Sequence, residues 1–241
     1  MSTPNSKYSF FSNADIDAID ANPHVNFFTP VLHEAMSLVG SPSAICDVGC
    51  GNGVFTSCLK AWGGVGRLIG IDGSPYALQQ AQLLGFDELR LVQDFSSNSL
   101  PFDDETFEFV INKDVLEHLL NPEALVDEMV RITKSGGYLL VSVPNHFPIA
   151  GRLQLLLHNK IDTFGYFPKA HRWDFPHIRF FNKTDFLLLM ESKGLKPVHC
   201  LSHHFPAIPR VGRLMTERAR KYLSRKYPDA FAEAHCWLFK K

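Results

Sequence analysis

The feature that most constrains the fold is a series of short apolar segments that alternate with helical patterns. Five such segments are predicted to be strands: residues 44–48, 67–71, 89–92, 107–112 and 138–143. Apolar runs without polar alternation are typical of strands covered on both faces, as in a parallel sheet. Helices are predicted between them, over 54–62, 75–84 and 122–134. This alternation predicts an α/β fold with right-handed crossovers and a doubly wound, mostly parallel sheet.

Size and charge narrow the class of protein. A chain of 241 residues can bury one sizeable α/β core, so we expect a single domain. The formal net charge of −1 provides no basic field for nucleic acid. The five cysteines form no Cys-x-x-Cys pair, which favours reduced thiols. Neither a membrane-spanning run nor a signal-peptide pattern is present, so we expect a cytoplasmic protein without stable membrane insertion.

A glycine loop follows the first predicted strand. It reads Asp47-x-Gly49-x-Gly51-x-Gly53. Glycines allow a tight turn and a close ligand, and the helix N-terminus that follows favours an anionic group. A dinucleotide loop would read Gly-x-Gly-x-x-Gly, whereas here the third glycine comes one residue early and Val54 stands in its place. This spacing argues against an NAD-dependent oxidoreductase, which we keep as a third hypothesis.

Acidic residues also follow the second and third predicted strands. Asp72 is placed to accept both ribose hydroxyls of a nucleoside, or alternatively to cap a helix. Asp94 and Phe95 follow the third strand, where Phe95 could pack on an aromatic ring or belong to the core. Ligands of such sheets bind beyond the carboxyl ends of the strands, so these positions predict a nucleoside site.

The glycine loop and the stretches that follow resemble the class I S-adenosylmethionine (SAM)-dependent methyltransferases. The matching stretches include LPFDDETFEFVI and DVLEHLLNPEALVDEMVRITKSGGYLLVSVPN, and together they cover about residues 44–145. They resemble the small-molecule methyltransferases of types 11 and 12. The resemblance implies a Rossmann-like, seven-stranded sheet with an antiparallel last strand. Residues 196–205 and 234–240 would form its closing hairpin.

The resemblance also implies a SAM site, whose product form is S-adenosylhomocysteine (SAH). Asp47 and the glycines would hold the methionine end, Asp72 the ribose, and Asp94 with Phe95 the adenine, while Asn112 would lie near the sulfonium. The complete set of expected cofactor-binding residues is Asp47, Gly49, Cys50, Gly51, Gly53, Asp72, Gly73, Ser74, Gln93, Asp94, Phe95, Asn112 and Lys113.

One candidate base follows the fourth predicted strand. His118 can take a proton from an acceptor, because its unperturbed pKa lies near working pH; alternatively, it is a structural histidine in the first turns of a helix. The spacing of Asp114, Glu117 and His118 resembles a metal cluster of some family members, since positions i, i+3 and i+4 share one helical face. Acidic residues are also favoured at helix starts, and we predict no metal.

Residues 146–182 form a longer connection than is needed to join two elements of such a sheet. They combine cationic and aromatic side chains, which suits an anionic or aromatic substrate, and we expect them to fold over the site as a lid. The alternative is a packed connection with an ordinary polar surface. The lid candidates are His146, Arg152, His171, Trp173 and Arg179.

Two further segments flank the core, which spans 44–145. Residues 1–42 are predicted to form a helical cap, with a helix over 15–39 that is interrupted near Pro23 and Pro30. Residues 206–232 form a basic helical insertion before the last strand, helical over 211–227. Its cationic face is interpreted as solvated surface rather than as a membrane contact.

A closer resemblance, to the methionine-biosynthesis W protein family, covers residues 142–145, 151–161, Trp173 and 176–186. The first forty residues and the tail from Leu201 have no counterpart in it.

The main hypothesis is SAM-dependent methyl transfer to a small-molecule acceptor, with oxygen as the expected nucleophile. The alternative is a non-catalytic SAM-binding subunit or regulator of a methionine-biosynthesis acyltransferase complex. An acyltransferase partner or a homo-oligomer is compatible with either hypothesis.

Overall fold

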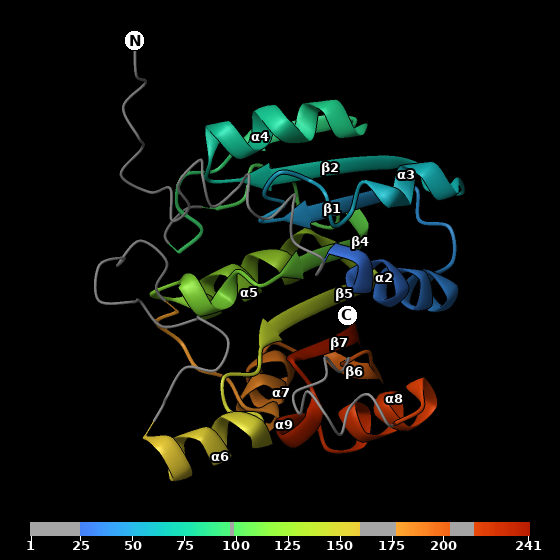
Figure 1. The fold of residues 1–241 in the computed structure, drawn as a ribbon. Coiled ribbons are helices and arrows are strands. Elements are labelled where there is room, and N and C mark those ends of the chain that lie inside the picture. Colours follow the sequence, from blue (N-terminus) through green and yellow to red (C-terminus); the bar gives the residue numbers. More distant parts are fainter. Residues whose placement is uncertain (1–24, 97–98, 160–176, 203–214) are drawn as a thin grey trace.

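The computed structural model describes residues 25–96, 99–159, 177–202 and 215–241 (Figure 1). Within these ranges seven strands form one sheet, in the order β3-β2-β1-β4-β5-β7-β6. The first five strands run parallel, and β7 is antiparallel to both of its neighbours. The predicted seven-stranded, mostly parallel sheet is therefore confirmed. The strands are β1 Ala44–Val48, β2 Arg67–Asp72, β3 Glu88–Leu91, β4 Phe107–Lys113, β5 Thr133–Pro144, β6 Lys196–Cys200 and β7 Ala234–Lys240.

Helices cover both faces of this sheet. On one face, α5 and α7 bury Met129 and Phe186 against alternate residues of β4, β5 and β7. On the other, α2 and α3 bury Leu32 and Leu59 against the remaining alternate residues. The described helices are α2 Val25–Val39, α3 Cys58–Trp62, α4 Pro75–Ala81, the 3₁₀ turns η1 Gln82–Leu84 and η2 Leu116–His118, α5 Pro122–Ile132, α6 Ile149–His158, α7 Lys183–Ser192, α8 Glu217–Lys226 and α9 Pro228–Phe231.

Side-chain caps explain where several helices begin. Ser74 accepts a hydrogen bond from Ala77 N, and Asn121 accepts one from Ala124 N. Each cap is followed by a proline at the first helical position, where the missing N–H costs nothing. The carboxyl end of β2 and the loop before α5 are therefore fixed by local sequence.

The structure corrects two predicted helices in the N-terminal half. Pro30 lies inside α2 and does not interrupt it. Proline removes one backbone hydrogen bond there, and the burial of Phe28, Leu32 and Ala35 against the sheet offsets that loss. The helix predicted over 54–62 begins only at Cys58, because the preceding residues form turns anchored on Gly53 O.

Further corrections concern element ends. The helix expected to reach Lys134 ends at Ile132, and β5 begins at Thr133. Backbone pairing of Gly136 and Gly137 with Lys241 draws this stretch toward β7. Within the predicted segment 196–205, β6 ends at Cys200, and residues 203–205 lie outside the described ranges.

The two flanking segments are described only in part. The basic helix α8 begins at Glu217, later than predicted, because Thr216 is extended and caps it. Residues 211–214 lie outside the described ranges, as do residues 15–24 of the predicted N-terminal helix.

The aromatic cluster between α7 and the sheet yields a stability prediction. Phe186 is fully buried and its ring lies 5.8 Å from that of Phe239. Replacing Phe186 with alanine leaves a cavity, so we expect the free energy of unfolding to fall by roughly 3–5 kcal/mol in urea denaturation. Leu156→Ala is the control, because Leu156 is 79% exposed, and it should have little effect. Equal losses in the two variants would contradict the assigned core.

Candidate functional site

The candidate site lies at the edge of the sheet where the parallel strands end. The arrowheads of β1, β2 and β5 point to the same side of the molecule (Figure 1). Ligands of doubly wound sheets bind at this edge, beside the point where strand order reverses. Here the order reverses between β1 and β4, which are adjacent in the sheet.

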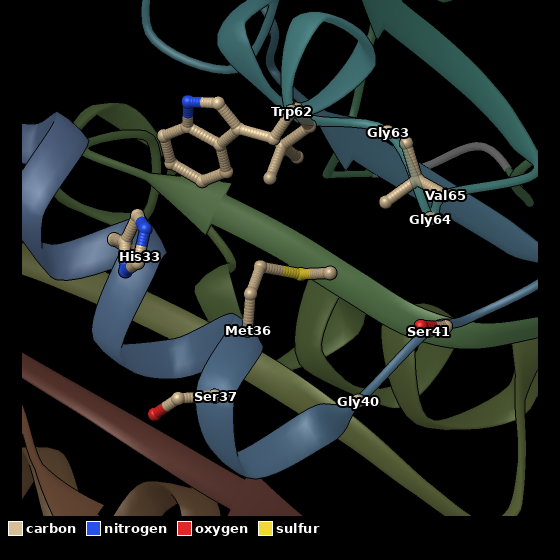
Figure 2. A pocket seen from close by; sticks show the side chains of 10 residues that line it. His33, Met36, Ser37, Gly40, Ser41, Trp62, Gly63, Gly64 and Val65 are labelled. Atoms are coloured by element: carbon tan, nitrogen blue, oxygen red, sulfur yellow. The ribbon is translucent and has the colours of Figure 1, made fainter.

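A cavity of about 190 Å³ lies at the opposite edge (Figure 2). Trp62 and His33 form one wall, with ring centroids 5.1 Å apart, and Met36 forms another. The cavity also contacts residues 40–41, which precede β1, and residues 63–65, which precede β2. It is therefore at the amino ends of these strands and is separate from the candidate site.

The glycine loop is bound to the end of β2. The N–H groups of Gly49 and Cys50 both donate to Ile71 O, at 2.8 and 3.0 Å. Gly49, Gly51 and Gly53 all have positive φ, which side chains other than glycine rarely tolerate. A Cβ on Gly49 would strike Val115, whereas one on Gly51 would meet no described atom within 4 Å. Among the described residues, Gly51 therefore has room beside it that Gly49 lacks.

Asp72 joins this loop to the next helix. One carboxylate oxygen accepts from Gly51 N at 2.8 Å, and the other accepts from Ser74 N at 2.8 Å. Burial raises the pKa of Asp72, opposed by the N–H groups of Ser74, Gly51 and Gly73. Each carboxylate oxygen can accept a second hydrogen bond, so the predicted contact to a ribose diol is compatible with this geometry.

The carboxylate of Asp47, in β1, is held by a residue that follows the glycine loop. It is 3% exposed and accepts a 2.5 Å hydrogen bond from the Thr56 hydroxyl. Burial raises the pKa of Asp47 to about 7. Sequence reasoning missed Thr56, whose hydroxyl fixes this carboxylate. Only the buried position of an acid in a strand hinted that it needs such a partner.

The predicted adenine contacts are less distinctive. Asp94 accepts from Ser96 N at 2.7 Å, Phe95 packs against the core, and Gln93 is exposed. All three follow β3, beside the loop that Asp72 anchors. Their contact with a cofactor stays a prediction.

Asn112 and Lys113 close the strand end that faces β1. Asn112 donates to Val48 O at 2.9 Å, while its Oδ1 atom is buried and has no partner among the described residues. The Lys113 ammonium lies 4.1 Å above the ring of Phe55 and pairs with Asp114. An orphaned amide oxygen at this strand end is a polar position available to a bound ligand.

A buried cluster follows β4. His118 lies in η2 and is 5% exposed, and its ring lies 4.8 Å from that of His177. His177 in turn lies 2.8 Å from His146, measured between Nδ1 and Nε2. Burial lowers the pKa of His146 to about 4 and that of His177 to about 3, so both rings are neutral near pH 7. Three histidines from different segments thus meet beside Glu117.

The predicted helical alignment of Asp114 with Glu117 and His118 is wrong. Asp114 has a φ of 54°, and only Leu116–His118 form a 3₁₀ turn. Asp114 instead receives hydrogen bonds from Lys113 and from the Ser142 hydroxyl. Glu117 is fully buried, and burial raises its pKa well above the usual range.

The five lid candidates separate into three groups. His146 reaches the histidine cluster. Arg152 donates to Phe147 O and Asp229 O, and Arg179 donates to Leu120 O, so both side chains tie backbone segments together. His171 and Trp173 lie outside the described residues. His177 was not among the predicted site residues; its only signal was its place in a histidine-rich stretch.

Known proteins resemble this chain most over its core. Residues 46–141 match the family described as "Methyltransferase domain". An uncharacterized methyltransferase of Schizosaccharomyces pombe is 34% identical over 113 residues, 43% of this chain and 41% of that protein. A ubiquinone biosynthesis O-methyltransferase of Aliivibrio fischeri is 29% identical over 135 residues, 52% of this chain and 56% of that protein. The chain thus spans less than two thirds of these relatives.

The similarity in fold to solved structures covers more of the chain than the sequence matches do. The crystal structure of a SAM-dependent methyltransferase from Thermotoga maritima, a possible histamine N-methyltransferase, has a TM-score of 0.62 at 19% identity and covers 97% of both chains. The chain therefore has the Rossmann-like fold of the class I SAM-dependent methyltransferases. The match to the methyltransferase domain family covers residues 46–141. No helix among the described residues is long and apolar enough to cross a membrane.

Buried histidine makes the stability of the site depend on pH. His235, in β7, is fully buried, and burial lowers its pKa from 6.5 to about 4. Between these pH values the unfolded chain binds a proton that the folded chain does not, so stability falls as pH drops through this window. In His235→Gln we expect this loss to be smaller by roughly 3 kcal/mol, measured by urea denaturation at pH 7 and pH 4. Identical pH profiles for both proteins would contradict the buried neutral imidazole.

Proposed function

We propose that the chain transfers a methyl group from SAM to a small-molecule acceptor, with oxygen as the nucleophile. The observation that carries this proposal is the glycine loop, whose Gly51 N–H is bound to Asp72 and whose open side faces the strand ends. The match to the methyltransferase domain supports it. The O-methyltransferase relative favours oxygen over nitrogen or carbon.

The residues present fit such a cofactor. Gly51 leaves room where any other residue would place a Cβ, and Asn112 has a buried amide oxygen without a partner among the described residues. Asp72 would accept the ribose hydroxyls, and Asp47 with the glycines of the loop would hold the methionine end. Asp94 and Phe95 would border the adenine. When bound, the cofactor supplies an electrophilic methyl group on sulfur.

The residues of this chain would align the acceptor with the cofactor and enclose both. In-line displacement needs the acceptor atom opposite the sulfur, with water excluded. The acceptor would lie beyond β4 and β5, where His118 and His146 form a buried wall. A methyl–sulfur bond breaks, a methyl–oxygen bond forms, and the hydroxyl proton must leave. His118 was predicted to take that proton, and it lies in the right region to do so.

The regulator hypothesis receives no support from the comparisons, and the similarity to the W protein family remains a prediction. Buried titratable groups beside the cofactor loop also favour a reaction over simple cofactor sensing, because burial shifts the pKa values of catalytic groups.

Two glycines offer a matched test of the cofactor site. Gly51 and Gly85 both have positive φ, and a Cβ on either meets no described atom within 4 Å. Alanine at either position should therefore cost similar folding free energy, about 1 kcal/mol. Only Gly51→Ala should weaken binding of SAM and SAH, by about tenfold or more, in calorimetric titrations of ligand-stripped protein. Equal affinities in the two variants would remove the loop from the cofactor site.

Turnover is tested separately. We expect SAH to accumulate when the protein is incubated with SAM and a panel of small hydroxylated compounds, and Asp72→Ala to lose most of that activity through weaker cofactor binding. Matched amine acceptors distinguish oxygen from nitrogen. SAM binding without SAH release on any acceptor would contradict the proposed activity and favour a non-catalytic role.

A further inference from the structure

The least explained group in the described structure is the side chain of Glu117. It is fully buried, and neither of its carboxylate oxygens has a hydrogen-bond partner among the described residues. Leaving such a group unsatisfied costs several kcal/mol, so a native protein normally pairs it, protonates it or gives it an ion. The proposed methyl transfer makes no use of this carboxylate.

Two imidazoles stand beside it. One potential ligand atom from each of Glu117, His118 and His177 lies within 4.8 Å of the other two, and all three residues are buried. In a zinc site each such atom lies roughly 2.0–2.2 Å from the ion, so these side chains would have to rotate inward on binding.

The backbone holds these residues together although they are distant in sequence. The N–H groups of Ile178 and Arg179 donate to Glu117 O, at 2.8 and 3.0 Å. The Arg179 guanidinium donates to Leu120 O, on the far side of the same turn. The segment that carries His177 is therefore bonded to the turn that carries Glu117 and His118.

His146 supports the cluster from behind. Its Nε2 atom lies 2.8 Å from Nδ1 of His177, which orients the His177 ring. Histidine ligands of metal ions usually have one ring nitrogen fixed in this way by a neighbour. Asp114 is not part of the set, because it turns toward Lys113 and Ser142.

We propose that Glu117, His118 and His177 bind one divalent transition-metal ion, of the Zn²⁺ or Co²⁺ type. Two imidazoles and one carboxylate form the set typical of zinc sites that keep an open coordination position. Mg²⁺ prefers oxygen ligands and fits this set less well. This site replaces the metal-free cluster predicted from sequence.

The role of the ion rests on the proposed function. Its open position would take the acceptor hydroxyl and lower the pKa of that hydroxyl, so that the proton leaves to water. The alkoxide oxygen then takes the methyl group, and the products are the methyl ether, SAH and one proton. His118 would be a metal ligand and not the base. The rival explanation is a neutral, protonated Glu117 with no ion.

The test measures metal binding directly. Protein without an affinity tag is stripped with chelator, dialysed, and titrated with Zn²⁺ and with Co²⁺. We expect one ion per chain, and a loss of affinity of about 100-fold or more in Glu117→Gln and His177→Gln. His146→Gln should lose about 10- to 100-fold, because it removes a supporting partner and not a ligand. His158→Gln is the control, since His158 is exposed at the end of α6, and its affinity should not change.

Binding below one ion per chain in the wild type, or binding that survives Glu117→Gln and His177→Gln, would overturn the proposal. If these variants do not fold, the wild-type Co²⁺ spectrum decides: a four- or five-coordinate histidine site gives visible bands much stronger than those of aqueous cobalt. A spectrum like that of aqueous cobalt rejects the site. SAM and SAH titrations of the metal-free protein are run in parallel, so that failure of the metal site and failure of the cofactor site are distinguished.

Discussion

The candidate site depends on the hydrogen bonds that tie the glycine loop to the end of β2. Ile71 O receives two N–H groups from the loop, and Asp72 receives a third from Gly51. These bonds can form only because β1 and β2 are parallel neighbours whose carboxyl ends meet at one edge. The positive φ values of the three glycines let the loop make this tight turn. The sheet thus fixes the conformation of the loop that we propose as the cofactor site.

Burial determines the properties of the second part of the candidate site, where we propose that the acceptor binds. The turn after β4, the end of β5 and the segment before α7 together enclose Glu117, His118, His146 and His177. Removal from water keeps His146 and His177 neutral and leaves both carboxylate oxygens of Glu117 without a hydrogen bond among the described residues. Neutral imidazoles and a carboxylate in one dry site are suited to an ion or to proton transfer, and poorly suited to a purely structural core. The candidate site therefore combines the glycine loop with a buried cluster of one carboxylate and three histidines.

Local signals explain which parts of the fold could be predicted. The apolar strands, the glycine loop and the Asn121-Pro122 cap are encoded within a few residues, and the structure has them where they were expected. Tertiary packing overrode local rules elsewhere: α2 continues through Pro30, and β5 begins at Thr133 because the chain end pairs with it. The number of strands and the antiparallel last strand came from resemblance, and the order of the strands was not predicted, since periodicity alone cannot order strands.

The candidate site likewise contains residues that could be predicted from local sequence and residues that could not. Asp47, Asp72 and the glycines follow predicted strands, so their convergence could be expected. The meeting of His177 with His118 could not, because they are 59 positions apart in the sequence and backbone bonds to Glu117 O bring them together. Thr56 was missed for a related reason, since its partner becomes evident only when the loop is folded.

Hydrogen exchange in the presence of SAH tests the central claim most directly, because it locates the ligand on the chain. The account predicts slower amide exchange at residues 49–57, 72–74 and 93–95 when SAH is added, with no change at residues 36–41 and 62–65 beside the cavity of Figure 2. Protection at that cavity, or unchanged exchange at the glycine loop under saturating SAH, would contradict the assignment of the cofactor site to the carboxyl ends of the strands.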